Sequence, residues 1–323
     1  MTKTETNQWR AWAIMAVILY HLQAAVFEDQ LLPNGTGLFA WWRQLEQVPY
    51  AWLGWPAWLG IAGVNLFFAL SGYGLVKSRQ QKPKEVARVR LWRRIKRVWV
   101  PYAVAHPVTH LLAGLVAVWV WHDSLTWPIW LSWYPWQNYL ISLLLLPRWW
   151  SEQNMFVFVG SWWFVGVIVQ FYLVFPWLWK LLTWLGRDKF WLTCLAMGWI
   201  YRLILVVSSI AAPVAVRGSQ HVWWLQLPAR LPEFATGMYL ANGGRRAWWW
   251  GWWWLPLAGL LSSWAWGWVM SDWLLAVGMW DLVARLNRYL PIRWRSLWAT
   301  MGLWSYYIYL YHEPLLGWLV RGY

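Results

Sequence analysis

Long apolar segments recur along the whole chain of 323 residues, separated by short polar and basic stretches. About 20 mostly apolar residues suffice for an α-helix to cross the hydrocarbon core of a bilayer. Nine segments have this length, and each predicts one membrane-spanning helix. They are residues 9–27, 57–77, 98–121, 161–183, 189–210, 222–242, 247–265, 267–286 and 298–319.

A shorter apolar piece, NYLISLLLLP at residues 138–147, leaves the number of crossings open between nine and ten. The loops predicted between the spans include four basic stretches, at residues 77–97, 186–189, 243–246 and 285–295, which help to choose between these models. With nine spans, all four lie on the same side as the N-terminus, which the positive-inside rule makes cytoplasmic. A tenth crossing would divide them between the two sides, so we expect residues 138–147 to re-enter the membrane instead.

The composition agrees with a multi-span membrane protein. Hydrophobic residues make up 60% of the chain and charged residues 12%, which a soluble chain of this length could hardly bury. The net charge of +15 would suit nucleic acid, but the basic residues cluster between apolar segments and mostly report topology. We predict an all-α, polytopic helical bundle of nine to ten transmembrane helices, as a single domain over residues 1–323 and without a nucleic-acid partner.

The rarer residue types predict structural roles. Tryptophan occurs 41 times, more often than two interfacial belts require, and we favour lipid-facing packing over carbohydrate stacking. The single cysteine, Cys194, lies in an apolar run, which excludes an intramolecular disulfide and predicts a buried thiol. His106 and His110 have the spacing of a metal-binding pair, but no third ligand is suitably spaced, so we expect no metal.

The first apolar segment carries two ionisable residues, Arg10 and His21. Eleven residues apart on a helix, they point to nearly the same face and lie roughly 16 Å apart along the axis. With the N-terminus inside, Arg10 lies at the cytoplasmic interface and His21 lies deep toward the other leaflet. An ionisable group at depth predicts a functional site, and a histidine satisfied by a neighbouring helix explains the position equally well.

Further motifs follow in order along the chain. AGVNLFFALSGYGLV contains Phe67, Ser71 and Gly72 in the order Phe-x-x-x-Ser-Gly, and RRIKRVWVPY contains Arg94 and Arg97 as Arg-x-x-Arg. With the Arg-x10-His of the first helix, these motifs resemble family three of the membrane-bound acyltransferases, from residue 9 to about 318. The stretches that carry the resemblance are residues 62–76, 93–102, 161–179, 227–241 and 305–316.

Two positions depart from the family pattern. Asn65 stands where the family has an acidic residue before its Phe-Phe pair, and Val169 stands where an acidic residue often precedes the Gln-Phe-Tyr run. Each difference removes a carboxylate that could orient or balance charge in the site.

The resemblance implies an integral membrane O-acyltransferase of a bacterial inner membrane. Its donor would be acyl-coenzyme A, with an acetyl or other short acyl group, and its acceptor a hydroxyl of a cell-surface glycan or lipid-linked sugar. His21 would be the base, since imidazole titrates near neutral pH. Arg10, Arg94 and Arg97 would bind the donor phosphates from the cytoplasmic side, although positive-inside charge or anionic lipid contact explains any one of them. We expect no bound cofactor.

Each of the other polar residues has a structural interpretation as well as a functional one. The chain has no Gly-x-Ser-x-Gly elbow, so Ser71 is a hydrogen-bonding helper or, more commonly for such a residue, a helix-packing contact. Arg230 and Glu233 lie one helical turn apart. They either form a buried charged pair that clamps the structure or bind the acceptor. We expect His312, beside Glu313, to be an interfacial histidine on the outer side.

Two other classes of function remain open. A transporter or flippase would use His21, Arg230 and Glu233 as a polar path, but the chain lacks the internal symmetry typical of such proteins. A non-catalytic membrane scaffold would explain the tryptophan excess and the two lost carboxylates. Consumption of an acyl donor that depends on His21 would separate the enzyme from both.

Overall fold

The computed structural model describes residues 1–26, 54–119, 143, 159–211, 224–244, 251–262 and 264–320. These residues confirm the all-α prediction, because they form helices and short turns and contain no strand. The α-helices are α1 (Lys3–Val26), α3 (Gly54–Gln81), α4 (Ala87–Trp119), α8 (Trp163–Leu185), α9 (Arg187–Ala211), α12 (Leu227–Ala241), α13 (Trp254–Leu261), α14 (Trp268–Tyr289) and α15 (Ile292–Val320). Two 3₁₀ turns, η2 (Gly160–Trp162) and η4 (Ala265–Gly267), precede α8 and α14.

Each of the nine predicted segments overlaps one of these helices, but the helices differ in their capacity to cross a membrane. Among the described residues, three stretches are long and apolar enough: Gly60–Gln81, Gly160–Leu185 and Arg187–Ser208. Helix α13 has only eight residues, about 12 Å, too short to cross by itself where we predicted a span over 247–265. Residues 138–147 lie outside the described part apart from Leu143.

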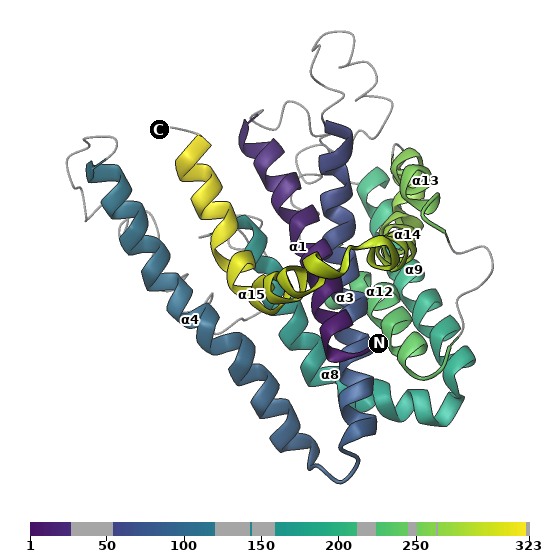
Figure 1. Cartoon of the computed structure of the whole chain (residues 1–323). Coiled ribbons are helices and arrows are strands. Elements are labelled where there is room, and N and C mark those ends of the chain that lie inside the picture. The colour runs from purple at the N-terminus through teal and green to yellow at the C-terminus, as the bar shows by residue number, and fades with distance from the viewer. Residues whose placement is uncertain are drawn as a thin grey trace.

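The predicted basic loop at residues 77–97 is wrong in its local structure, because most of it is helical. Helix α3 continues to Gln81 and α4 begins at Ala87, which leaves only residues 82–86 as the turn, at the bottom of Figure 1. Pro83 explains the break, since proline has no backbone N–H and disfavours helix in the residue before it. The basic side chains of α4 therefore project from a regular helix.

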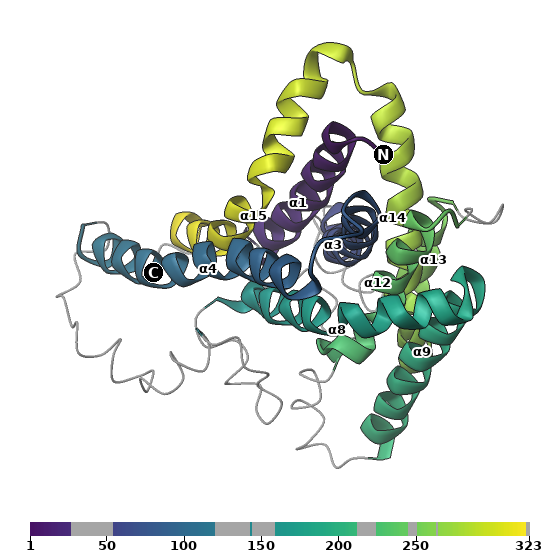
Figure 2. The same cartoon turned by 90° about the horizontal axis from the view of Figure 1, so that it is seen from below.

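Helix α3 lies at the centre of the molecule. It packs against α1, α12, α14 and α8, and Figure 2 shows it nearly end-on with these helices around it. Helix α15 covers the other side of α1 and also contacts α4. The first and last described helices, α1 and α15, are thus neighbours.

Glycine permits the closest contact between α3 and α12. A Cβ on Gly72 would meet the carbonyl oxygen of Phe234, and a Cβ on Gly237 would meet that of Ala69. These are backbone atoms, which cannot move aside as a flexible side chain can. Small residues let helix backbones approach in this way within membranes. The glycine of the Phe-x-x-x-Ser-Gly motif therefore has a packing role.

Candidate functional site

The three arginines predicted to bind the donor come together from two helices. Arg10 of α1 lies close enough to Arg94 and Arg97 of α4 for their charges to interact. Tyr172 of α8 interacts with both Arg10 and Arg94, and its hydroxyl oxygen accepts a hydrogen bond from Arg94. Arg94 also donates to the carbonyl oxygen of Gly74 at 3.3 Å. Packing of α1, α4 and α8 thus builds a cluster of like charges.

Neighbouring arginines of α4 differ from this cluster, because a carboxylate neutralises them. Nε of Arg90 lies 3.0 Å from Oε2 of Glu85, and Arg93 contacts Oε1 of the same residue. Desolvation raises the pKa of Glu85, but the hydrogen bond from Arg90 and the charges of both arginines outweigh it, so the pKa lies below its ordinary value.

Within the described part of the chain, Arg10, Arg94 and Arg97 have no carboxylate partner of this kind. Arg10 and Arg97 are exposed and Arg94 is half-buried, so all three remain accessible. Protein nevertheless surrounds the Arg10 guanidinium closely enough to desolvate it. Three guanidinium groups that lack a carboxylate partner among the described residues, in a partly desolvated setting, form a strong anion-binding surface.

His21 lies three turns further along α1, and its neighbour is His312 of α15. Their ring centroids are 4.8 Å apart and the rings meet edge to face at 71°. The ring of Tyr20 lies on the His21 ring as well, with 5.1 Å between centroids. His21 is half-exposed, whereas His312 is only 5% exposed. Packing of α15 on α1 therefore buries His312 beside His21, while its place at the membrane interface stays a prediction.

The contacts of His312 assign its tautomer. Nδ1 lies 2.7 Å from the carbonyl oxygen of Tyr309. A carbonyl oxygen only accepts hydrogen bonds, so Nδ1 carries a proton, and Nε2 of the neutral ring is a bare acceptor. Nε2 is buried and has no hydrogen-bond partner among the described residues. An acceptor that is available inside the protein therefore lies next to His21.

Further hydrogen bonds hold His312 in place by attaching α15 to the η2 turn. Oε2 of Glu313 accepts from the backbone N–H of Ser161 at 2.6 Å, and the Tyr309 hydroxyl donates to the Ser161 carbonyl. Trp162 Nε1 donates to the carbonyl oxygen of Leu310 at 3.0 Å. Glu313 therefore binds the backbone of the η2 turn, and these contacts join α15 to that turn.

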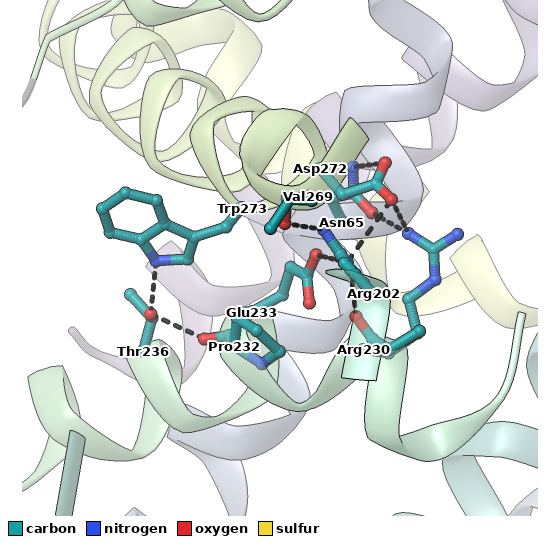
Figure 3. A network of polar contacts seen from close by, with 10 residues as sticks. Asn65, Arg202, Arg230, Pro232, Glu233, Thr236, Val269, Asp272 and Trp273 are labelled. Atoms are coloured by element: carbon teal, nitrogen blue, oxygen red, sulfur yellow. Dashed lines mark hydrogen bonds and ion pairs between the residues drawn. The ribbon is translucent and has the colours of Figure 1, made fainter. Parts of the chain in front are cut away.

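Arg230 and Glu233 do not pair with each other as we predicted; each pairs with another helix (Figure 3). Glu233 lies 2.6 Å from Arg202 of α9, and Arg230 lies 2.7 Å from Asp272 of α14. Arg202 also approaches Asp272, at 3.4 Å. Two positive and two negative groups therefore form a balanced network that joins three helices. We name these four residues, with Asn65, the buried charge network.

Asn65 connects the buried charge network to α3. Its Oδ1 accepts from Arg230 at 3.2 Å, and its Nδ2 donates to Oδ1 of Asp272 at 3.3 Å. A carboxylate at this position would add a negative charge beside Asp272 and could not donate to it. The amide is therefore suited to these neighbours, and it accounts for one departure from the family pattern. We find no structural explanation for Val169.

The sequence predictions missed Arg202 and Asp272. Both lie within segments that we predicted to span the membrane, where a charged residue is itself a signal. Arg202 is fully buried and also donates from Nε to the carbonyl oxygen of Ala229 at 2.7 Å. That signal identifies the two residues as important, but it does not identify their partners.

The remaining candidates are packed in the core or make no described polar contact. Phe67 is half-buried, with its ring 6.0 Å from that of Phe164. Ser71 is half-buried, and no hydrogen bond of its side chain is found among the described residues. His106 is buried between the rings of Tyr102 and Trp162, each 4.6 Å away, whereas the side chain of His110 lies outside the described part.

Two expectations about rarer residues can be compared with the described residues. Cys194 is a buried free thiol, as predicted. A search of the described residues for groups of three or more histidine, cysteine or acidic side chains able to hold a metal ion finds none.

Comparison with known proteins gives one match. The model of the acyltransferase 3 family, described as an acyltransferase domain, matches residues 5–322. The match covers nearly the whole chain and includes both Arg10 and His21 of α1. No curated protein and no solved structure matches the chain.

Proposed function

Because the chain belongs to the acyltransferase 3 family of membrane-bound O-acyltransferases, we propose that it moves a short acyl group, such as acetyl, from acyl-coenzyme A to a sugar hydroxyl. The acceptor is a cell-surface glycan or a lipid-linked sugar, and the enzyme lies in an inner membrane with its N-terminus in the cytoplasm. The observation that carries this proposal is that α1 places Arg10 in a cluster of three arginines without a carboxylate partner among the described residues, and places His21 beside His312.

The arginine cluster suits the donor. Coenzyme A carries several phosphate groups, and guanidinium groups bind phosphate through two parallel hydrogen bonds. Arg10, Arg94 and Arg97 supply three positive charges without a described carboxylate partner. A donor anchored there can extend its thioester along α1, where His21 lies roughly 16 Å further along the helix axis.

The histidine pair suits the transfer step. His21 takes the proton of the acceptor hydroxyl as its oxygen attacks the thioester carbonyl carbon. An ester C–O bond forms, the C–S bond breaks, and the proton passes from His21 to the departing thiolate. His312 is a positioning residue: its Nε2, which has no hydrogen-bond partner among the described residues, can accept a hydrogen bond from the protonated nitrogen of His21 during the reaction, while the other nitrogen of His21 acts as the base.

The alternative of a polar transport path has less support. Arg230 and Glu233 are engaged in ion pairs of the buried charge network. Such balanced contacts join helices, and moving a substrate past them would separate buried charges at high cost.

The test is transfer of labelled acetyl from acetyl-coenzyme A by the protein purified in detergent, with acceptor-containing membranes present. We expect His21→Ala to lower the rate by roughly 10²- to 10⁴-fold, the usual contribution of a general base. Arg88→Gln is the matched control, since Arg88 is exposed on α4, and we expect it to retain activity. Thermal unfolding of each variant checks that it is folded.

The outcomes separate the parts of the proposal. Full activity in His21→Ala would leave an acyltransferase but assign the base to another residue. If the folded wild-type protein neither consumes nor binds acetyl-coenzyme A, the proposed function is wrong.

A further inference from the structure

A pocket lies beside the arginine cluster, between the end of α3, the first turns of α4 and the middle of α8. Its enclosed volume is about 110 Å³, and it opens to the surroundings. Arg94 and Tyr172 line it, and these two residues also belong to the surroundings of Arg10. The pocket is therefore continuous with the proposed donor site.

One wall of the pocket is aromatic. Tyr172, Phe175 and Trp179 line it from α8, at spacings of three and four residues that place them on one helix face. Trp179 and Tyr172 are half-buried, so they present accessible ring surface, while Phe175 is buried behind them. Such a surface accepts a flat aromatic ring by stacking.

The other walls supply positive charge from α3 and α4. Arg79 and Arg94 line the pocket. Among the described residues, Arg79 donates to the carbonyl oxygen of Glu85 and Arg94 to Gly74 and Tyr172, so most of the five N–H donors of each have no partner there. Neither has a carboxylate partner in the part of the chain that the structure describes. Arg90 also lines the pocket, but Glu85 neutralises it.

We propose that this pocket binds the nucleotide end of the acyl-coenzyme A donor. The purine ring stacks on the aromatic wall at Trp179, and the phosphates attached to its ribose contact Arg79 and Arg94. This inference rests on the proposed function and assigns a binding role to Arg79, Trp179 and the α8 face. A lipid headgroup carries phosphate but no aromatic ring, so it would leave the aromatic wall unused, and we favour the nucleotide.

This placement separates donor binding from the chemical step. The pocket contacts only the end of the donor that does not react, whereas the chemistry takes place near His21. Changes in the pocket should therefore weaken donor binding and leave the chemical step intact once the donor is bound.

The experiment compares two donors, acetyl-coenzyme A and acetyl-pantetheine, which lacks the nucleotide. We expect Trp179→Leu and Arg79→Gln each to raise the KM for acetyl-coenzyme A about tenfold with little change in kcat. Neither substitution should change the KM for acetyl-pantetheine. The matched controls are Trp177→Leu, an exposed tryptophan two positions from Trp179, and Arg88→Gln; both should behave as the wild type.

A direct binding measurement tests the pocket assignment independently of acetyl transfer. Radiolabelled adenosine 3′,5′-bisphosphate should bind the wild-type protein and the two control variants, and should bind Trp179→Leu and Arg79→Gln about tenfold more weakly. Excess phosphatidylglycerol vesicles should not displace it. Displacement by the lipid, or lipid binding without nucleotide binding, would overturn the inference in favour of a headgroup site.

The inference and the proposed function can fail separately. If acetyl transfer proceeds but the pocket variants keep the wild-type KM for acetyl-coenzyme A, the pocket assignment is wrong and the function stands. If no protein transfers acetyl from either donor, the proposed function fails, and bisphosphate binding alone then decides the pocket assignment.

Discussion

The rings of His21 and His312 meet edge to face with 4.8 Å between their centroids, although these residues belong to the first and last described helices. Nδ1 of His312 donates its hydrogen bond to the Tyr309 carbonyl oxygen, so Nε2 is the hydrogen-bond acceptor of the ring. This pair unites a residue that the sequence identified as a candidate base with one that it did not.

We predict that His312→Phe lowers kcat for acyl transfer by roughly tenfold or more with little change in the KM for the donor. Phenylalanine preserves an edge-to-face ring contact with His21 but removes the Nε2 acceptor. His312→Gln should recover part of the rate, because its side-chain oxygen can accept a hydrogen bond. Tyr311→Phe, a half-buried neighbour on α15, is the control.

The pH dependence of kcat distinguishes positioning from packing in the same series. Loss of a hydrogen bond to the base should displace the acidic limb of the profile in His312→Phe, whereas a packing defect should lower the rate equally at every pH. A variant with wild-type kcat and an unchanged profile would show that His312 only fills space.

The buried charge network predicts a large loss of stability when one charge is removed. Asp272→Asn leaves Arg202 and Arg230 with a single carboxylate, and breaking a buried pair in this way costs about 3–5 kcal/mol. The exposed Asp188, 3.5 Å from Arg187, provides the control, and Asp188→Asn should cost less than about 1 kcal/mol. Unfolding in detergent measures both.

A double substitution tests whether charge balance is the cause. Arg230→Met with Asp272→Leu removes one charge of each sign, and we expect it to be more stable than Asp272→Asn alone. Equal stability of Asp272→Asn and Asp188→Asn would show that the buried charge network does not hold the helices together.

Two glycines of the central bundle should respond oppositely to alanine. A Cβ on Gly237 would meet the backbone carbonyl of Ala69, so Gly237→Ala must push α3 and α12 apart and should destabilise by about 1–3 kcal/mol. Gly74 has no atom within 4 Å of the added Cβ, so Gly74→Ala should be neutral or stabilising by up to about 1 kcal/mol. Thermal unfolding compares them, and an equal response would contradict the close contact.

Glu85 predicts a pH dependence in the turn between α3 and α4. Its pKa is below the ordinary value in the folded protein, since hydrogen bonding and charge from Arg90 and Arg93 outweigh desolvation. Its stabilising contribution is therefore complete above the ordinary carboxylate range and is lost as the pH falls through the lowered pKa. The difference in unfolding temperature between wild type and Glu85→Gln should be constant near neutral pH and vanish in strong acid. A difference that does not vary with pH would exclude this linkage.

Much of the local structure was predictable from the sequence. The apolar segments located nine helices. Backbone N–H and C=O groups inside a bilayer must hydrogen-bond within their own segment, and a continuous helix achieves this over such lengths. Arg10 and His21 could be placed on one face because helical periodicity is a local property. The basic stretch after residue 77 was misjudged, since high charge suggests a loop although residues Ala87–Trp119 form one helix.

Contacts between distant positions were decided by tertiary packing alone. Helical spacing suggested that Arg230 and Glu233 pair with each other, but the close approach of α12 to its neighbours gives each of them a partner of better geometry on another helix. Burial of His312 depends in the same way on α15 lying against α1.

The sequence by itself therefore determined which segments are helical, which residues share a face of one helix, and which family motifs the chain carries. Only the tertiary structure decided which helices meet, and with them the arginine cluster, the histidine pair, the buried charge network and the aromatic pocket. The physical reason is that periodicity acts over a few residues of one helix, whereas these sites depend on how separate helices pack, and that is set by the shapes and charges of all their side chains together.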